Sequence, residues 1–171
     1  MTLDKMNPPK YTRPEIERRW LVASNALPDL SELERWEVTD HYLKKTRMRL
    51  RKMVDPSQKN AAQYKLCKKY GKTSGISEPI VNIYLSEDEY FMFSSLDAYV
   101  LVKIKYAYEY RGVSFAINTF SGSRIVTIEA EFESEEEARK CPLPPFVGED
   151  ISSNREYESA SIARNLTRPR R

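Results

Sequence analysis

Apolar and polar residues alternate over most of the chain, which predicts a protein built mainly of short β-strands. Residues two apart in a strand point to the same face, so a two-residue period indicates one apolar and one polar face. Turn-forming clusters such as Asp55–Asn60 and Ser121–Gly122 separate the alternating stretches. The pattern predicts strands at residues 12–22, 36–42, 46–53, 63–69, 79–85, 99–108, 113–120 and 124–132.

Helix start signals stand between some of these strands. Ser86–Glu89 and Ser134–Glu137 have the sequence of capping boxes, in which a serine and the glutamate three residues later satisfy free amides of the first turn. Residues 153–156 form a third such box and predict a terminal helix. The stretch 27–36 (LPDLSELERW) predicts another short helix, and 141–150 (CPLPPFVGED) predicts an irregular connection.

Charge is segregated by strand, which favours a closed barrel over an ordinary half-exposed sheet. For one strand, a polar face in water is the usual interpretation, but neighbouring rows of like charge repel each other in a sheet. In a barrel the apolar rows face outward under the helices and the charged rows face a water-filled lumen. The rows are Glu15, Glu17 and Arg19; Arg47, Arg49 and Arg51; Lys65 and Lys69; Lys103 and Lys105; and Glu129, Glu131 and Glu133.

We therefore expect an α+β fold of mostly antiparallel β-structure: a closed eight-stranded tunnel barrel with a few covering helices. The 171 residues suit a single domain spanning 1–171, with loose tails at 1–12 and 167–171. A lumen lined with cations is costly unless a polyanion fills it. Carboxylates on one side of that lumen would bring a divalent cation to the polyanion, as in phosphoryl-transfer sites.

Composition excludes several other classes. The net charge of +3 does not favour a nucleic-acid partner, and no apolar run approaches the length of a membrane span. The single histidine argues against a zinc hydrolase or a Ser-His-Asp triad, so any metal should be hard and held by oxygen, as Mg²⁺ or Mn²⁺ is. Two cysteines and the absence of a secretory signal at the N-terminus favour the reduced cytoplasm.

The ordered motifs resemble those of the CYTH domain, the triphosphate tunnel metalloenzymes. EIERRWLV (15–22) is similar to the family's ExExK start, with Arg19 at the lysine position. The resemblance continues through HYLKKTRMRLRK, YKLCKKYG, VLVKIKY, IEAEFESEEEA and PPFVGEDISSNREYESASIA, and covers roughly residues 13–163. It implies an antiparallel eight-stranded tunnel that binds triphosphate compounds with Mg²⁺ or Mn²⁺. Small bacterial members are typically inorganic triphosphatases; others are thiamine triphosphatases or class IV adenylyl cyclases.

The resemblance also implies roles for individual residues. Lys103 resembles the family's catalytic lysine, and Tyr42 resembles a tyrosine that pairs with it and activates water, although packing is the alternative for Tyr42. Lys65 is added because it shares the face of Lys69. The implied metal-side carboxylates are Glu15, Glu17, Glu129 and Glu131, and the implied phosphate-binding residues are Arg19, Arg49, Arg51, Lys65, Lys69, Lys103 and Lys105.

The chain departs from the family pattern on two strands. Ala116 and Asn118 replace one carboxylate pair, and Val81 and Ile83 stand where the family has glutamates. Fewer carboxylates weaken the case for turnover more than the case for anion binding. Arg19 is either a phosphate contact or the partner of a neighbouring glutamate, and Cys67 is a small filler of the lumen rather than a nucleophile.

The sequence thus predicts a metal-dependent hydrolase of a triphosphate, with inorganic triphosphate (tripolyphosphate), cleaved to diphosphate and phosphate, as the first choice of substrate. ATP or another nucleoside triphosphate is an alternative small-molecule partner; neither a nucleic acid nor a membrane is expected. The alternative functions are a class IV-type adenylyl cyclase and a non-catalytic polyphosphate or nucleotide-binding protein. A homodimer is compatible with the sequence, but no motif predicts one.

Overall fold

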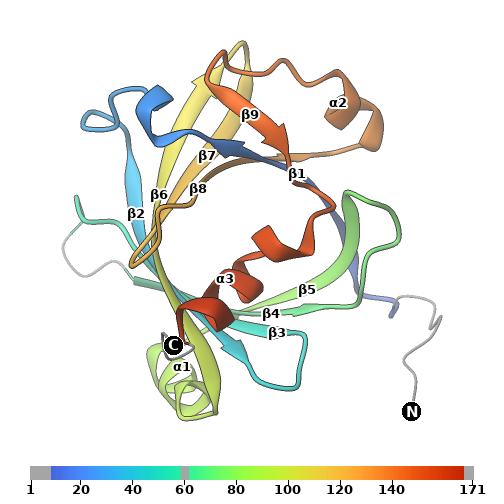
Figure 1. Ribbon diagram of the computed structural model, residues 1–171. Helices are drawn as coiled ribbons and strands as arrows, with labels where there is room; N and C mark the ends of the chain where they lie inside the picture. The colour runs from blue at the N-terminus through green and yellow to red at the C-terminus, as the bar shows by residue number, and fades with distance from the viewer. Residues whose placement is uncertain (1–8, 59–61, 168–171) are drawn as a thin grey trace.

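The computed structural model describes residues 9–58 and 62–167, which form a ring of strands around a tunnel (Figure 1). The strands are β1 (Arg13–Val22), β2 (Arg35–Leu43), β3 (Met48–Val54), β4 (Ala62–Lys69), β5 (Ser77–Leu85), β6 (Ala98–Tyr110), β7 (Val113–Phe120), β8 (Val126–Phe132) and β9 (Val147–Asp150). The helices are α1 (Glu87–Ser94), α2 (Glu135–Lys140) and α3 (Ser159–Leu166), with 3-10 turns η1 (Ser24–Ala26) and η2 (Arg155–Tyr157).

The sheet closes on itself through its first strand. Its order is β5-β4-β3-β2-β6-β7-β8-β1, and β1 returns to pair with β5, so eight strands complete the barrel. All pairings are antiparallel, and β9 adds a short ninth strand to β1. The β1–β5 contact that closes the barrel is short and runs only from Arg13–Ile80 to Ile16–Ser77. The predicted fold, a mostly antiparallel eight-stranded tunnel with a few helices, is confirmed.

The apolar faces of the strands point outward, as the alternation predicts, and most of them are covered; Ile83, Val100 and Val102 are exposed. One outer core contains the fully buried Trp20, Ile117 and Ile128, and residues of the 27–30 loop and of β9 pack against it. A second outer core around Leu50 lies under α1. Burying apolar area in this way supplies about 25 cal/mol per Å², so the outside of the barrel holds the fold together and leaves the inside free for charge.

One end of the tunnel is closed by α3, which lies inside the ring of strands in Figure 1. Ile162 and Ala163 of this helix are buried against Leu101 and Phe120, two residues on the inner face of the barrel. We call this the plugged end. The opposite end carries the beginning of β1, the end of β8 and the β6–β7 hairpin, and we call it the mouth.

The helix predicted at residues 27–36 is wrong. Beyond η1 the chain runs through turns to residue 34, and Trp36 already belongs to β2. The Asp29 side chain accepts a hydrogen bond from the Ser31 amide (2.9 Å), which fixes a turn in place of a helical one. Leu27 and Leu30 anchor this loop to the outer core, so tertiary contacts override the helical spacing of its apolar residues.

Two further boundaries differ from the prediction. Residues 147–150 of the expected irregular connection form β9, because they find the edge of β1 that β5 leaves free. The terminal helix begins later than predicted: Asn154 caps η2, and α3 starts at Ser159. The capping box of Ser86 and Glu89 is confirmed, whereas Ser134 caps α2 and Glu137 bonds the amide of Glu133 instead.

The predicted loose tails, 1–12 and 167–171, fall mostly on residues outside those described. The same holds for the last part of the predicted turn at Asp55–Asn60, whose first residues do form a turn through a bond from the Gln58 amide to the Asp55 carbonyl (3.2 Å). Over the described ranges, no helix is both long and apolar enough to cross a membrane.

Candidate active site in the charged tunnel

Strand pairing brings the predicted cations together on the inner face of the barrel. Residues that pair across antiparallel strands point to the same side, and Arg51 pairs with both Asp40 and Lys65. Lys103 and Lys105 follow on β6, and Lys69 lies at the end of β4. All seven predicted phosphate-binding residues therefore lie on the tunnel side: Arg19, Arg49, Arg51, Lys65, Lys69, Lys103 and Lys105.

Asp40, which the sequence analysis did not select, is the centre of this group. Its fully buried carboxylate accepts two hydrogen bonds from Arg51, at 2.7 and 2.8 Å, and lies 3.8 Å from Nε of Arg49. Although burial acts in the opposite direction, Arg51 and Arg49 hold the pKa of Asp40 well below its usual range. Asp40 is therefore a carboxylate that fixes the arginines in place.

Positive charge exceeds negative charge around Asp40. We call Arg49, Arg51, Lys65 and Lys103 the cation cluster. Asp40 pairs with the two arginines, at 3.8 and 2.7 Å, and its charge also acts on Lys103, whereas Lys65 lies beside the arginines. Nε of Arg49 is buried without a hydrogen-bond partner among the described residues. Burial lowers the pKa of Lys65, and the neighbouring Arg51 and Arg49 lower it further. An anion bound here would relieve both the repulsion and the unpaired donor.

Lys103 is the most buried of the lysines in the cation cluster, with 4% of its surface exposed. Burial lowers the pKa of Lys103 to about 8, although Glu129 acts to raise it. A lysine with this pKa can both hold and release a proton near neutral pH, as a group that assists phosphoryl transfer requires. Its register neighbours are Val38 and Phe120, so the apolar surroundings explain the loss of hydration.

Tyr42 lies on the same inner face but nearer to the plugged end. Its hydroxyl donates to the Asp40 carboxylate at 3.4 Å, and its ring packs against the apolar group at α3. Burial raises the pKa of Tyr42 to about 12, and Asp40 adds to that effect. Tyr42 therefore keeps its proton at neutral pH, and its link to Lys103 runs through Asp40.

The predicted metal-side carboxylates line the opposite wall, on β1 and β8. Glu15 binds the Lys69 ammonium at 2.5 Å, and Glu17 binds Nε of Arg19 at 2.9 Å. Glu129 lies 3.9 Å from Lys105 and Glu131 is exposed toward the mouth. Arg19 thus pairs with a neighbouring glutamate, which was one of its two predicted roles.

Two of these carboxylates, Glu17 and Glu129, lie close enough to repel each other, so a cation between them would be favourable. Burial raises the pKa of Glu17, and the charge of Glu129 raises it further. Although burial acts in the opposite direction, Lys103 and Lys105 hold the pKa of Glu129 down to about 2. A hard cation between these half-buried carboxylates would relieve their repulsion. Within residues 9–58 and 62–167, no three His, Cys, Asp or Glu side chains are already grouped as a metal site.

Asn118 adds a neutral polar group to the tunnel wall. It is fully buried and pairs in register with Lys105 and Thr127. Its amide lies close enough to Glu129 to lower the pKa of that carboxyl, yet neither amide atom makes a well-formed hydrogen bond among the described residues. A buried amide with no such partner is a group that a ligand or ordered water would satisfy.

The structure corrects the assignment of β5. Lys69 pairs with Ile80 and Cys67 pairs with Asn82, so even-numbered residues face the tunnel. Val81 and Ile83, the positions compared with the family's glutamates, point outward. The inner positions of β5 are Glu78, Ile80, Asn82 and Tyr84, none of which the sequence analysis selected. Burial raises the pKa of Cys67, which fits its predicted role as a filler.

The segment after β9 lies along the seam of the barrel and was also missed. Lys72 donates to the carbonyl of Ser152 at 2.6 Å, and the Arg19 guanidinium donates to the carbonyl of Tyr157 at 3.2 Å. The Ser152 hydroxyl accepts from the Arg19 amide at 3.0 Å. These bonds connect the C-terminal segment to β1 and to the β4–β5 loop, and so hold Arg19 in its position in the tunnel.

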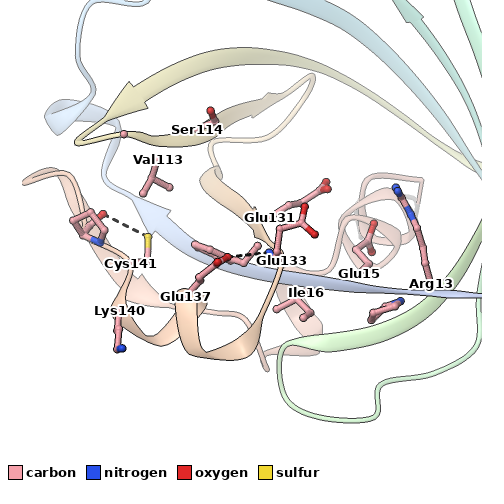
Figure 2. Close-up of a pocket in the computed structure, with 14 residues that line it drawn as sticks. Arg13, Glu15, Ile16, Val113, Ser114, Glu131, Glu133, Glu137, Lys140 and Cys141 are labelled. Atoms are coloured by element: carbon pink, nitrogen blue, oxygen red, sulfur yellow. Dashed lines mark hydrogen bonds between the residues drawn. The ribbon is translucent and has the colours of Figure 1, made fainter.

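A cavity of about 670 Å³ opens at the mouth, beside the beginning of β1 and the end of β8 (Figure 2). Glu15 and Glu131 reach it from the tunnel side, and Ile16 and Cys141 line its outer part. Its glutamates make it unsuitable for a polyanion. The cation cluster, on the other wall of the tunnel, is therefore the better anion site.

Comparison with solved structures supports this description. The inorganic triphosphatase NE1496 is 25% identical, with a TM-score of 0.58 over 91% of this chain and 97% of that one. The protein PH1819 from Pyrococcus horikoshii OT3 is 17% identical (TM-score 0.53, 90% of each chain). An adenylate cyclase-like protein from Bacillus halodurans is 15% identical (TM-score 0.53, 75% of this chain and 86% of that one).

The likeness is visible only in three dimensions and in short motifs. No protein-family model matches the sequence, and no curated protein is similar to it. The closed eight-stranded tunnel, the inward rows of charge and the shared fold of an inorganic triphosphatase agree with one another. The chain therefore has the CYTH-like tunnel fold of the inorganic triphosphatase NE1496, as its sequence motifs predicted.

Proposed function

We propose that the protein is a divalent-metal-dependent hydrolase that cleaves inorganic triphosphate to diphosphate and phosphate. The observation that carries this proposal is the cation cluster, in which Arg49 and Arg51 share the single carboxylate of Asp40 and Lys65 and Lys103 add further positive charge. A linear chain of phosphates supplies several negative charges along one direction, which matches cations on β4, β3 and β6, with β2 and its Asp40 between β3 and β6. The similarity to the inorganic triphosphatase NE1496 supports the same substrate class.

The arginines and lysines would bind and orient the substrate. The fixed fork of Arg51 is aligned by Asp40, and Nε of Arg49 is free to donate to a phosphate oxygen. Lys65 and Lys105 would neutralise the oxygens nearer the mouth. Holding the phosphates against a rigid set of charges prepares the geometry for in-line attack, and positioning of this kind provides most of the catalysis in phosphoryl transfer.

Lys103 would act at the bond that breaks. Its ammonium can donate to the oxygen that leaves, and a polyanion beside it would raise its pKa from about 8 and keep the proton in place. Tyr42 keeps its proton and serves as a donor that orients Asp40. The apolar plug formed by α3 excludes water from that end of the tunnel.

Mg²⁺ or Mn²⁺ would be held by the oxygens of Glu17 and Glu129, with Glu15 and Glu131 as further ligands. The observation that supports this fit is the repulsion between the half-buried carboxylates of Glu17 and Glu129. When bound, the ion would neutralise charge on the phosphate oxygens and activate water for attack. The residues of the chain set its place opposite the cation cluster.

Two other functions are alternatives. An adenylate cyclase-like protein shares the fold, and a cyclase would convert ATP to cyclic AMP without releasing orthophosphate. A non-catalytic polyphosphate sensor is favoured by Ala116 and Asn118, which leave β7 without a carboxylate on its inner face. It would bind triphosphate without turnover at any metal concentration.

Release of orthophosphate from inorganic triphosphate and from ATP, with Mg²⁺ or Mn²⁺, tests the proposal. The expected result is rapid release from triphosphate that falls by at least about a hundredfold in both Glu129→Gln and Lys103→Ala. Phe91→Ala, an exposed position on α1, is the matched control and should retain the parent rate. Tight binding of triphosphate without release would instead favour the sensor, and cyclic AMP from ATP would favour the cyclase.

A further inference from the structure

A lysine lies between two glutamates where the β1–β5 contact closes the barrel. Glu15 of β1 and Glu78 of β5 are register partners across this contact, and both face the tunnel. The Lys69 ammonium of β4 lies 2.5 Å from Oε2 of Glu15 and 3.6 Å from Oε2 of Glu78. We call Glu15, Lys69 and Glu78 the closing triad. The proposed function gives Glu78 no role and does not account for the place of Lys69.

The closing triad holds a permanent positive charge. The side chains of both glutamates are 16% exposed, so their charges are screened less than those of surface residues. Oε1 of Glu78 accepts a hydrogen bond from the Gly71 amide at 2.9 Å, which fixes this carboxylate beside the ammonium. Although burial acts in the opposite direction, Glu15 and Glu17 raise the pKa of Lys69, so its ammonium stays charged.

The closing triad is next to the place proposed for the metal ion. Glu15 and Glu17 lie two residues apart on the same face of β1, and the charges of Glu15 and Lys69 both act on Glu17. Some enzymes that cleave phosphate bonds use two metal ions about 3.5–4 Å apart. Without Lys69 between them, Glu15 and Glu78 would repel each other and offer oxygens to a second hard cation beside the one at Glu17 and Glu129.

We propose that the Lys69 ammonium takes the place of a second divalent cation, so that the tunnel binds a single metal ion. The proposal rests on the proposed function, because it needs the first ion at Glu17 and Glu129. An ammonium neutralises charge and donates hydrogen bonds, but it does not lower the pKa of a bound water as a metal ion does. Lys69 would thus neutralise Glu15 and Glu78 and hold β1, β4 and β5 together without supplying a nucleophile.

The number of Mn²⁺ ions bound without substrate, counted by electron paramagnetic resonance of the free ion, tests the proposal. The parent should bind one ion per chain. Lys69→Met removes the ammonium but keeps an unbranched side chain of similar length, and it should bind two. Adding Glu78→Gln to Lys69→Met removes one carboxylate of the second place and should restore one. Lys140→Met is the matched control, because Lys140 also pairs with a glutamate, at 2.6 Å, but on the surface; it should bind one ion.

Thermal melting gives a second readout that covers loss of folding. In EDTA, Lys69→Met should melt below the parent because Glu15 and Glu78 then repel each other. Mn²⁺ at about 100 times its Kd should raise the Tm of Lys69→Met about 5 °C more than that of the parent, since it fills one place more. A variant that folds only with Mn²⁺ would support the proposal equally.

The remaining outcomes separate this proposal from the proposed function. Two ions on the parent, or a single ion on a folded Lys69→Met, would overturn the role of Lys69 and leave the hydrolase standing. So would a Lys69→Met that stays unfolded in Mn²⁺, because the ion would then be unable to replace the ammonium. No ion on the parent would overturn both the single-ion tunnel and the metal dependence of the hydrolase.

Discussion

The two walls of the tunnel hold their charges in different ways. On the β1–β8 wall each of three carboxylates has a cation of its own: Glu15 with Lys69, Glu17 with Arg19, and Glu129 with Lys105. On the facing wall Arg49 and Arg51 share Asp40, Lys103 lies under the influence of both Glu129 and Asp40, and Lys65 has no ion-pair partner among the described residues. The first wall is close to neutral, and the second carries a surplus of positive charge. The comparison indicates that ion pairs stabilise the β1–β8 wall, whereas the excess positive charge of the facing wall is suited to binding an anion.

The largest expected effect comes from removing the one carboxylate of the cation cluster. Asp40→Asn leaves Arg49 and Arg51 buried without a compensating charge, and breaking a buried pair in this way costs about 3 kcal/mol of the free energy of unfolding. Glu15→Gln on the other wall should cost about 1 kcal/mol or less, because the Lys69 side chain is 36% exposed and can reach water. Urea denaturation of both variants, without ligand, measures the comparison.

The loss of stability in acid also tests the role of Asp40 in the cation cluster. The pKa of Asp40 is lower in the folded protein than its unfolded value of 3.8, so the stability it provides is present above that pH and is lost as pH falls below it. We expect the parent to lose about 1–3 kcal/mol more of its free energy of unfolding than Asp40→Asn between pH 4 and pH 2. Identical acid profiles would show that Asp40 does not hold the arginines.

In the absence of metal, a polyanion that binds the cation cluster should raise the free energy of unfolding. Saturation with inorganic triphosphate at about 100 times its Kd provides about 2.7 kcal/mol, or a rise in Tm of about 5–10 °C for a chain of this length. Orthophosphate at the same concentration should give a smaller rise because it carries less charge. Thermal melting in EDTA measures both, and Arg49→Ala should reduce the response to triphosphate more than Lys140→Ala, a change on the exposed face of α2.

The strands and the charge rows could be predicted from the sequence, because alternation is a local signal that a closed sheet preserves. Asp40 could not, since it stands alone in a strand with no second charge on its face, and only pairing with β3 gives it two arginines. A signal was nevertheless present: Asp40 precedes Tyr42 by two residues and therefore shares its face. The register of β5 was misjudged by one residue, which exchanged Val81 and Ile83 for Asn82 and Tyr84.

Other misses arose from contacts distant in sequence. The 27–36 segment has apolar residues at helical spacing, but those residues serve to anchor a loop on the outer core. β9 exists because β5 leaves one edge of β1 free beyond Ile16, a vacancy that no local pattern shows. The roles of the candidate residues stay predictions, because the fold fixes where the side chains lie, whereas activity measurements test what they do.

The pH profile should depend on Lys103. Burial places the pKa of Lys103 at about 8 in the free protein, so its charge is present below that pH and is lost above it. The kcat/KM for triphosphate should fall about tenfold per pH unit above pH 8 as the ammonium deprotonates. In Lys103→Arg the remaining activity should not show this fall, because a guanidinium stays charged. Steady-state rates from pH 6 to pH 10 measure this alkaline fall in kcat/KM. If the fall persists in Lys103→Arg, a group other than Lys103 causes it.

The smallest expected effect comes from adding a charge at Asn118 of β7, next to the β1–β8 wall. This amide lies beside Glu129 with its donor and acceptor unsatisfied, so Asn118→Asp adds a third carboxylate near Glu17 and Glu129 without a change of size. Mn²⁺ affinity, followed by electron paramagnetic resonance, should rise a few-fold, worth about 1 kcal/mol, because each added anionic oxygen favours a hard cation. Triphosphate affinity without metal should fall by a similar factor. Thr127→Ser, a buried neighbour with unchanged charge, is the control; a loss of Mn²⁺ affinity in Asn118→Asp would place the cation elsewhere in the tunnel.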